Sequence, residues 1–145
     1  MFRKVELFAI AALTAGAGLT GVTVLTGAAV AQNSPPALFT ADQATQGGPV
    51  YQAQCAPCHG SALEGVAAPA LKGEQFKAMA AAQGLTAQSL LTVVAQTMPQ
   101  SDPGSLSADQ YNQVVAYILQ QNGYPAGGDA LSPANPHLQD LDLSK

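Results

Sequence analysis

The sequence is poor in the residue types that bind charged partners. Of its 145 residues only 10% are charged, none is tryptophan, and only two are cysteine and two histidine. The part after residue 31 carries three lysines against eight acidic residues, a net charge of −5. Phosphate binding requires clustered Lys and Arg, so this composition excludes a nucleic-acid partner. The two cysteines lie too close together for a disulfide between them to constrain much of the chain.

The first 31 residues have the layout of an export signal. Arg3 and Lys4 form a positive start, residues 7–30 carry no charge, and Ala29-Val30-Ala31 is a small-x-small cleavage pattern. The apolar run exceeds the ~7–15 residues usual for a signal core, and at ~20 residues or more it is long enough to span a bilayer. We therefore expect residues 1–31 to be a signal peptide, with an uncleaved membrane anchor as the alternative. In both cases the remaining chain is delivered outside the cytoplasm.

The rest of the chain shows helical patterns and no strand pattern of useful length. Thr40 with Gln43, and Ser107 with Gln110, form capping boxes at the start of helices, and Thr86 is a further cap. Gly84 and Asn122-Gly123 are residue types that end helices. The expected helices cover residues 42–54, 74–82, 87–97 and 108–121. Pro49 lies inside the first of them and is expected to kink or split it.

These patterns divide the chain into four parts. Residues 32–39 contain Pro35 and Pro36 and are interpreted as a linker. Residues 40–124 are expected to form an all-α domain of three to four short helices. Residues 125–145 have little periodicity, so we expect an extended or disordered tail. So small a domain buries little apolar surface, and a large apolar cofactor at its centre would supply the missing core.

The segment Cys55-Ala56-Pro57-Cys58-His59 is the motif that carries chemistry, and its spacing suits three kinds of site. A zinc site needs about four ligands, and the only other histidine is His137, near the C-terminus. A thiol–disulfide exchange motif usually accompanies a βαβ pattern, which is absent. The third kind is the c-type haem attachment site, C-x-x-C-H. The two thiols add to the two vinyl groups of the porphyrin, and the adjacent histidine lies under the ring and binds the iron.

The second axial position of such an iron has three candidates. Met98 precedes Pro99, which favours an extended backbone at Met98 outside any helix, as a ligand loop requires. Met79 lies in an Ala-rich helical stretch, where methionine usually fills a core gap. His137 lies in a Pro-rich segment and is expected to be solvated. We therefore predict Met98 as the ligand, with Met79, His137 or an open position as alternatives.

Five segments in order resemble class I c-type cytochromes, over most of residues 40–124. They are Gly47 with Tyr51, "CAPCHG", "PALKG" at residues 69–73, "MPQSDPG" at residues 98–104, and "VVAYIL" at residues 114–119. The resemblance implies a covalent haem c held by Cys55 and Cys58 and an iron bound by His59 and Met98. It also implies that the Pro69 carbonyl accepts a hydrogen bond from His59. Gly47 is expected to meet Tyr117 where the first and last helices cross.

The resemblance further implies the function of a periplasmic electron carrier rather than an enzyme. A dehydrogenase would donate the electron, and an oxidase or another cytochrome of the respiratory chain would accept it. "YILQQNGYPAG" at residues 117–127 also resembles single-haem domains associated with periplasmic dehydrogenases. The alternatives are a dedicated cytochrome subunit of a dehydrogenase complex and a haem enzyme or sensor with an open sixth position. Contact with a membrane is expected only if residues 1–31 stay attached.

Overall fold

The folded part of the chain consists of helices joined by irregular segments. A computed structural model describes residues 34–145 and contains no strand there; the predicted signal peptide lies outside these residues. The helices are α1 (Ala41–Gln54), α2 (Ala56–His59), α3 (Gly73–Gln83), α4 (Ala87–Thr97), α5 (Ala108–Gln121) and the 3₁₀-helix η1 (Pro136–Gln139). The all-α expectation is thus confirmed, although α2 and η1 were not predicted. No helix within residues 34–145 has the length and apolar character needed to cross a bilayer.

Three of the helices begin where the sequence predicts. Thr40, Thr86 and Ser107 each accept a hydrogen bond from the backbone N–H three residues later, and the side chain of that residue bonds back to the cap. These reciprocal bonds satisfy N–H groups that have no partner inside the helix. Gly84 ends α3 in the left-handed conformation (φ 60°), which glycine adopts without a steric penalty.

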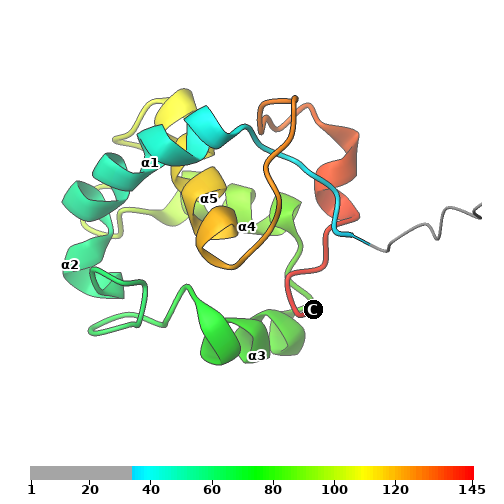
Figure 1. Ribbon diagram of the computed structural model, residues 1–145. Coiled ribbons are helices and arrows are strands. Elements are labelled where there is room, and N and C mark those ends of the chain that lie inside the picture. Colours follow the sequence, from blue (N-terminus) through cyan, green and yellow to red (C-terminus); the bar gives the residue numbers. More distant parts are fainter. Residues whose placement is uncertain (1–33) are drawn as a thin grey trace, which may run out of the picture. The chain divides into compact units, whose positions relative to one another are not determined.

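Helices α1 and α5 cross at the centre of the fold (Figure 1). Gly47 permits this crossing, because a β-carbon there would lie 1.9 Å from the carbonyl oxygen of Gln113 and 3.0 Å from Cβ of Tyr117. The expected contact with Tyr117 is therefore confirmed, and the backbone of Gln113 lies closer still. Beside it the rings of Tyr51 and Tyr117 pack with centroids 5.3 Å apart.

Pro49 is expected from the sequence to kink or split the first helix. Helix α1 runs unbroken through it, so the expected split is wrong. Proline removes one helical hydrogen bond and crowds the carbonyl four residues earlier. The buried face of α1, which includes Ala44, Gly47 and Tyr51, is packed against other elements, α5 above all. Helical structure is stabilised mainly by such packing, which here outweighs the local cost of proline.

The segments on either side of residues 40–124 are also part of the core, which corrects two expectations. Leu38 and Phe39, in the proposed linker, are 3% and 1% exposed. The tail folds back over the domain rather than being disordered, and four of its leucines are buried: Leu131, Leu138, Leu141 and Leu143. Pro133 and Pro136 interrupt any continuous helix or strand between these leucines, so periodicity does not reveal their burial.

Backbone hydrogen bonds attach this tail to the region where α3 meets α4. The Leu143 N–H donates to the Leu85 carbonyl at 3.0 Å, and the Ala87 N–H donates to the Leu141 carbonyl at 3.0 Å. At the other end of the tail, the Gln43 side chain accepts from the Leu131 N–H and donates to the Leu131 carbonyl. We call residues 131–143 the C-terminal strap.

Candidate functional site

A cavity of about 680 Å³ lies inside the domain. Its lining is mostly apolar and comes from residues of α1, α2, α3, α4, α5 and the loop between α2 and α3. The volume falls in the ~300–1,000 Å³ range of cofactor sites. The cavity thus has the size and lining of a site for a large apolar group, as the small predicted core suggested.

Cys55, Cys58 and His59 lie together at one side of this cavity. Both cysteines are free thiols, and burial raises the pKa of Cys55 to about 11. The short helix α2 follows directly from α1, and the Tyr51 hydroxyl donates a 2.7 Å hydrogen bond to the Gly60 carbonyl. This bond ties the end of α2 to the helix that precedes it, so the motif has a fixed orientation.

The orientation of the His59 ring is set by Pro69. Nδ1 of His59 lies 2.8 Å from the Pro69 carbonyl oxygen, and His59 is 8% exposed. A carbonyl can only accept, so the proton of this bond belongs to Nδ1. In a neutral imidazole Nε2 then keeps its lone pair, which is the form that binds a metal.

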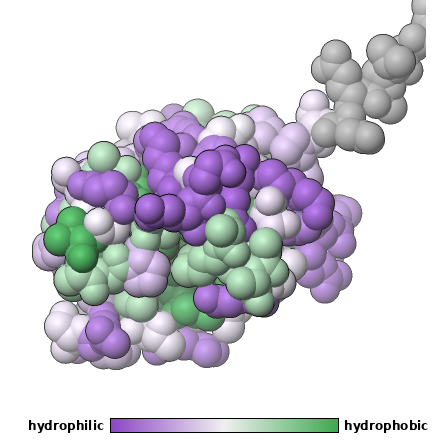
Figure 2. Space-filling model, turned by 90° about the horizontal axis from the view of Figure 1, so that it is seen from below, coloured by the Kyte–Doolittle hydropathy of each residue, from purple (hydrophilic) through white to green (hydrophobic). Residues whose placement is uncertain are grey.

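The loop between α2 and α3 is held against the same motif. The backbone N–H groups of Val66, Ala67 and Ala68 lie 3.0–3.2 Å from the Cys58 carbonyl oxygen. Ala67 and Ala68 line the cavity, whereas Val66 is 74% exposed. On the face seen from below, apolar surface lies among hydrophilic patches (Figure 2). The loop between α2 and α3, with Ala67 and Ala68, thus gives the cavity a border of small, uncharged residues.

Met98 also lines the cavity and lies where α4 ends. Its backbone is extended (φ −120°, ψ 151°), as the following proline predicts, and its N–H still donates to the Val94 carbonyl. Met79, in α3, lines the cavity as well. The structure thus brings Cys55, Cys58, His59, Pro69 and Met98 to one cavity, with Met79 beside them.

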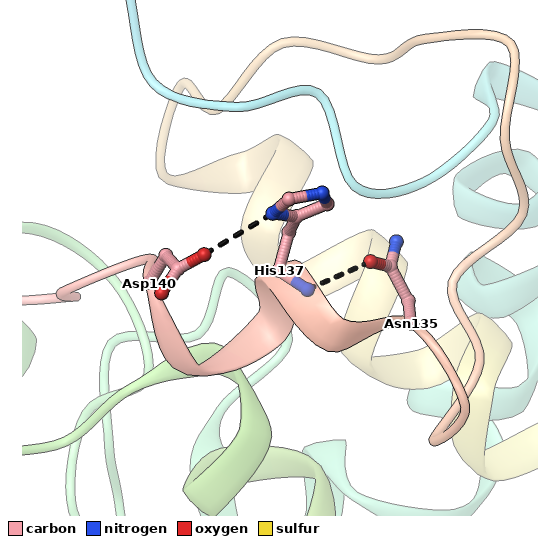
Figure 3. A network of polar contacts seen from close by, with 3 residues as sticks. All are labelled: Asn135, His137 and Asp140. Carbon is pink, nitrogen blue, oxygen red and sulfur yellow. Dashed lines mark hydrogen bonds and ion pairs between the residues drawn. The ribbon is translucent and has the colours of Figure 1, made fainter.

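His137 is not part of this site. It lies in η1, where its Nδ1 is 3.1 Å from Asp140 and its backbone N–H donates to the Asn135 side chain (Figure 3). Its side chain is 69% exposed. Within residues 34–145 no three His, Cys, Asp or Glu side chains form a cluster able to hold a metal ion.

The residues at the cavity fit a covalently attached haem. The cavity offers two free thiols at C-x-x-C spacing, an imidazole whose Nε2 keeps its lone pair, and the thioethers of Met98 and Met79. The family model described as cytochrome C oxidase, cbb3-type, subunit III matches residues 42–118. The chain belongs to this family. No curated protein and no solved structure matches the chain.

The protein is therefore a class I c-type cytochrome that carries covalent haem c, and its function is haem-based electron transfer. The match covers the helices and loops that line the cavity and ends before the C-terminal strap. The strap is thus an addition to the part of the cytochrome that the family model describes.

Two side chains of the cytochrome make contacts that the sequence did not indicate. The Tyr111 hydroxyl donates to the Met98 carbonyl at 2.8 Å. The Asn122 side chain donates to the Leu71 carbonyl at 2.8 Å and accepts from the Gly73 N–H at 3.1 Å. Helical periodicity accounts for Tyr111, and a helix end accounts for Asn122, so neither pattern pointed to the site.

Proposed function

We propose that the cytochrome is a single-electron carrier in which His59 and Met98 would hold the iron of the bound haem. The observation that carries this proposal is the His59–Pro69 hydrogen bond, which leaves Nε2 free at a cavity that Met98 also lines. The haem supplies an iron that cycles between Fe(III) and Fe(II). With His59 and Met98 both holding the iron, no place on the metal would be left for a substrate, so the protein would act as a carrier and not as an enzyme.

Each predicted residue has a separate task in this proposal. Cys55 and Cys58 hold the haem through thioether bonds. The Pro69 carbonyl orients the His59 ring and increases its basicity through the hydrogen bond at Nδ1. The thioether of Met98 favours Fe(II), so His/Met ligation gives a higher reduction potential than many other axial sets.

A pair of methionine variants tests the axial ligand. Met98→Ala is expected to lose the weak far-red absorption of Fe(III) bound to a thioether, and its reduction potential falls. Met79→Ala serves as the matched control, because Met79 lines the same cavity from α3. The proposal is wrong if the band survives in Met98→Ala, or if the wild type lacks it and binds carbon monoxide readily.

We also propose that the cytochrome works in the periplasm between a dehydrogenase and an oxidase or another cytochrome of the respiratory chain. The export pattern of residues 1–31 supports this location, as does C-type haem attachment outside the cytoplasm. Cell fractionation with intact-mass measurement tests it. The expected species is periplasmic, lacks residues 1–31 and carries the mass of one haem. A cytoplasmic holoprotein contradicts the proposal.

A second candidate is a permanent subunit of a larger redox complex. The family model that matches is named for an oxidase subunit, which supports this candidate. The strap gives it no support, since its leucines are buried against the cytochrome itself. Purification from native membranes under mild conditions separates the two: a subunit stays with its complex, and a free carrier elutes alone.

A further inference from the structure

Helix α5 contacts both loops that carry the axial-ligand machinery, through one polar side chain near each of its ends. We propose that Tyr111 and Asn122 are positioning residues: Tyr111 fixes the Met98 loop, and Asn122 fixes the loop on which Pro69 orients His59. This inference rests on the proposed function, in which His59 and Met98 are the ligands. In this inference α5 fixes the positions of both loops, the one that carries Met98 and the one that carries Pro69.

Tyr111 acts on the Met98 loop directly. Its side chain is buried, at 5% exposed, and its hydroxyl donates to the carbonyl of Met98 itself. The same hydroxyl lies 3.5 Å from the Leu106 N–H, further along the loop. One hydroxyl thus restrains the backbone at both ends of residues 98–106. The thioether depends on that backbone because Met98 is the last residue bonded to α4, and its extended φ and ψ turn the chain out of the helix.

Asn122 acts on the other loop from the C-terminal end of α5. Its Nδ2 donates to the carbonyls of Leu71 and of Ile118, and its Oδ1 accepts from the Gly73 N–H. Leu71, which lines the cavity, also donates through its N–H to Leu63 at 2.9 Å. These bonds fix the chain two to four residues after Pro69, whose carbonyl bonds His59.

The spacing along α5 places both side chains on the face that borders the cavity. Eleven positions separate Tyr111 from Asn122, close to three turns at ~3.6 residues per turn. Val114 and Ile118 lie on this face between them, are each 1% exposed, and line the cavity. One face of α5, buried at Val114 and Ile118, therefore connects the two loops, so the position of one ligand loop is fixed relative to the other.

The role of Tyr111 in fixing the Met98 loop is tested with Tyr111→Phe, measured in the haem-loaded protein. The matched control is Tyr117→Phe on the same helix. The Tyr117 hydroxyl has no hydrogen-bond partner among residues 34–145. We expect Tyr111→Phe to weaken the Fe(III)–thioether band and to increase the affinity of oxidised protein for imidazole by about tenfold, the equivalent of one net hydrogen bond. The control behaves as the wild type. Equal affinities in all three proteins overturn the role of Tyr111.

The role of Asn122 is tested with Asn122→Ala. Gln121→Ala, at the neighbouring residue, is the control. Among residues 34–145 the Gln121 side chain makes a hydrogen bond only with Lys72, at the surface. In Asn122→Ala we expect faster solvent exchange of the His59 Nδ1 proton in the reduced protein. We also expect a higher reduction potential, because a weaker bond to Pro69 lowers the basicity of the imidazole and its preference for Fe(III). The Fe(III)–thioether band remains.

A second variant of Asn122 is measured if the first does not fold. If Asn122→Ala does not fold, Asn122→Asp is measured instead, because it keeps the acceptor for Gly73 and loses the donations of Nδ2 to Leu71 and Ile118. An unchanged exchange rate and potential in the folded variant overturns the role of Asn122. A wild type without the thioether band overturns the proposed function, whereas a wild type with the band and unaffected variants overturns this inference alone.

Discussion

At the scale of single residues, Gly47 sets how closely α1 and α5 approach. The nearest atom to a β-carbon at this position is a backbone oxygen, which cannot move away as a flexible side chain can. Gly48 is adjacent, but a β-carbon there would meet only the Tyr117 ring, at 3.6 Å. The two glycines therefore differ in what an added methyl group would do.

Gly47→Ala is expected to lower the free energy of unfolding by about 3 kcal/mol, at the upper end of overpacking effects, because the helices must separate. Gly48→Ala is expected to raise it by about 0.5–1 kcal/mol, since alanine favours the helix over glycine. Denaturant unfolding of the two haem-loaded variants measures both. Equal destabilisation of the two would mean that the crossing does not depend on Gly47.

Tyr51 makes the stability of the cytochrome sensitive to alkaline pH. Burial raises its pKa well above the ordinary value of 10.0, and nearby Tyr117 and Glu64 act in the same direction. Above pH 10 the unfolded chain releases this proton while the folded chain keeps it, so the unfolded state binds fewer protons and the free energy of unfolding falls.

We expect that fall to reach about 1.4 kcal/mol per pH unit from this residue alone. Tyr51→Phe is expected to be about 1 kcal/mol less stable at pH 7, because the bond to Gly60 is lost, and to show a shallower decline above pH 10. Denaturant unfolding between pH 7 and 11.5 measures the slope. Parallel curves for both proteins would rule out Tyr51 as the cause.

At the scale of elements, the C-terminal strap closes the domain over the region where α3 meets α4. Leu138 is fully buried, whereas the preceding residue, His137, is mostly exposed. The strap also bonds to Leu85, which lines the haem cavity. It is therefore part of the folded unit and supports one wall of the site.

Leu138→Ala is expected to lower the free energy of unfolding by about 2–5 kcal/mol, the usual cost of truncating a fully buried leucine. His137→Ala tests the adjacent position and is expected to change it by less than about 0.5 kcal/mol. Thermal unfolding of both variants gives the comparison. A negligible effect of Leu138→Ala would show that the strap is not docked in solution.

The sequence predicts elements that are marked by hydrogen bonds between nearby residues. It does not predict features that depend on contacts between distant parts of the chain. Capping boxes at Thr40 and Ser107 mark helix starts because the bonds are made within four residues. The continuity of α1 through Pro49 depends on packing against other elements, and the burial of Leu138 depends on the rest of the fold. The same distinction holds at the site. The C-x-x-C-H motif is local. The hydrogen bond from Tyr111 to Met98 joins two segments, and no sequence pattern predicts that they lie together.

At the scale of the whole molecule, the cytochrome offers few charges to a partner. Each lysine of the described residues has a polar neighbour: Lys72 bonds Gln121, Lys77 lies 3.8 Å from Glu74, and Lys145 bonds Asp142. The loop bordering the cavity is uncharged from residue 65 to residue 71. Long-range electrostatic steering is therefore expected to be weak.

We expect the rate of electron exchange with a protein partner to change by less than about tenfold between low and high ionic strength, below the range of strongly steered encounters. Stopped-flow measurements over a salt series test this. A cytochrome with a lysine-rich surface, measured with the same partner, is the control that should slow steeply. A steep decrease for the present protein would contradict docking through uncharged surface.

The pair of rings at the helix crossing provides an intrinsic optical probe. Because the chain has no tryptophan, its ultraviolet fluorescence comes from four tyrosines, and two of them, Tyr51 and Tyr117, pack together where α1 meets α5. A haem held by Cys55, four residues after Tyr51 in the chain, would absorb the excitation energy of these rings in the folded protein. Separation of the two helices moves the rings apart and away from the haem, so tyrosine emission rises. The cytochrome thus reports the opening of its own central contact without any added label.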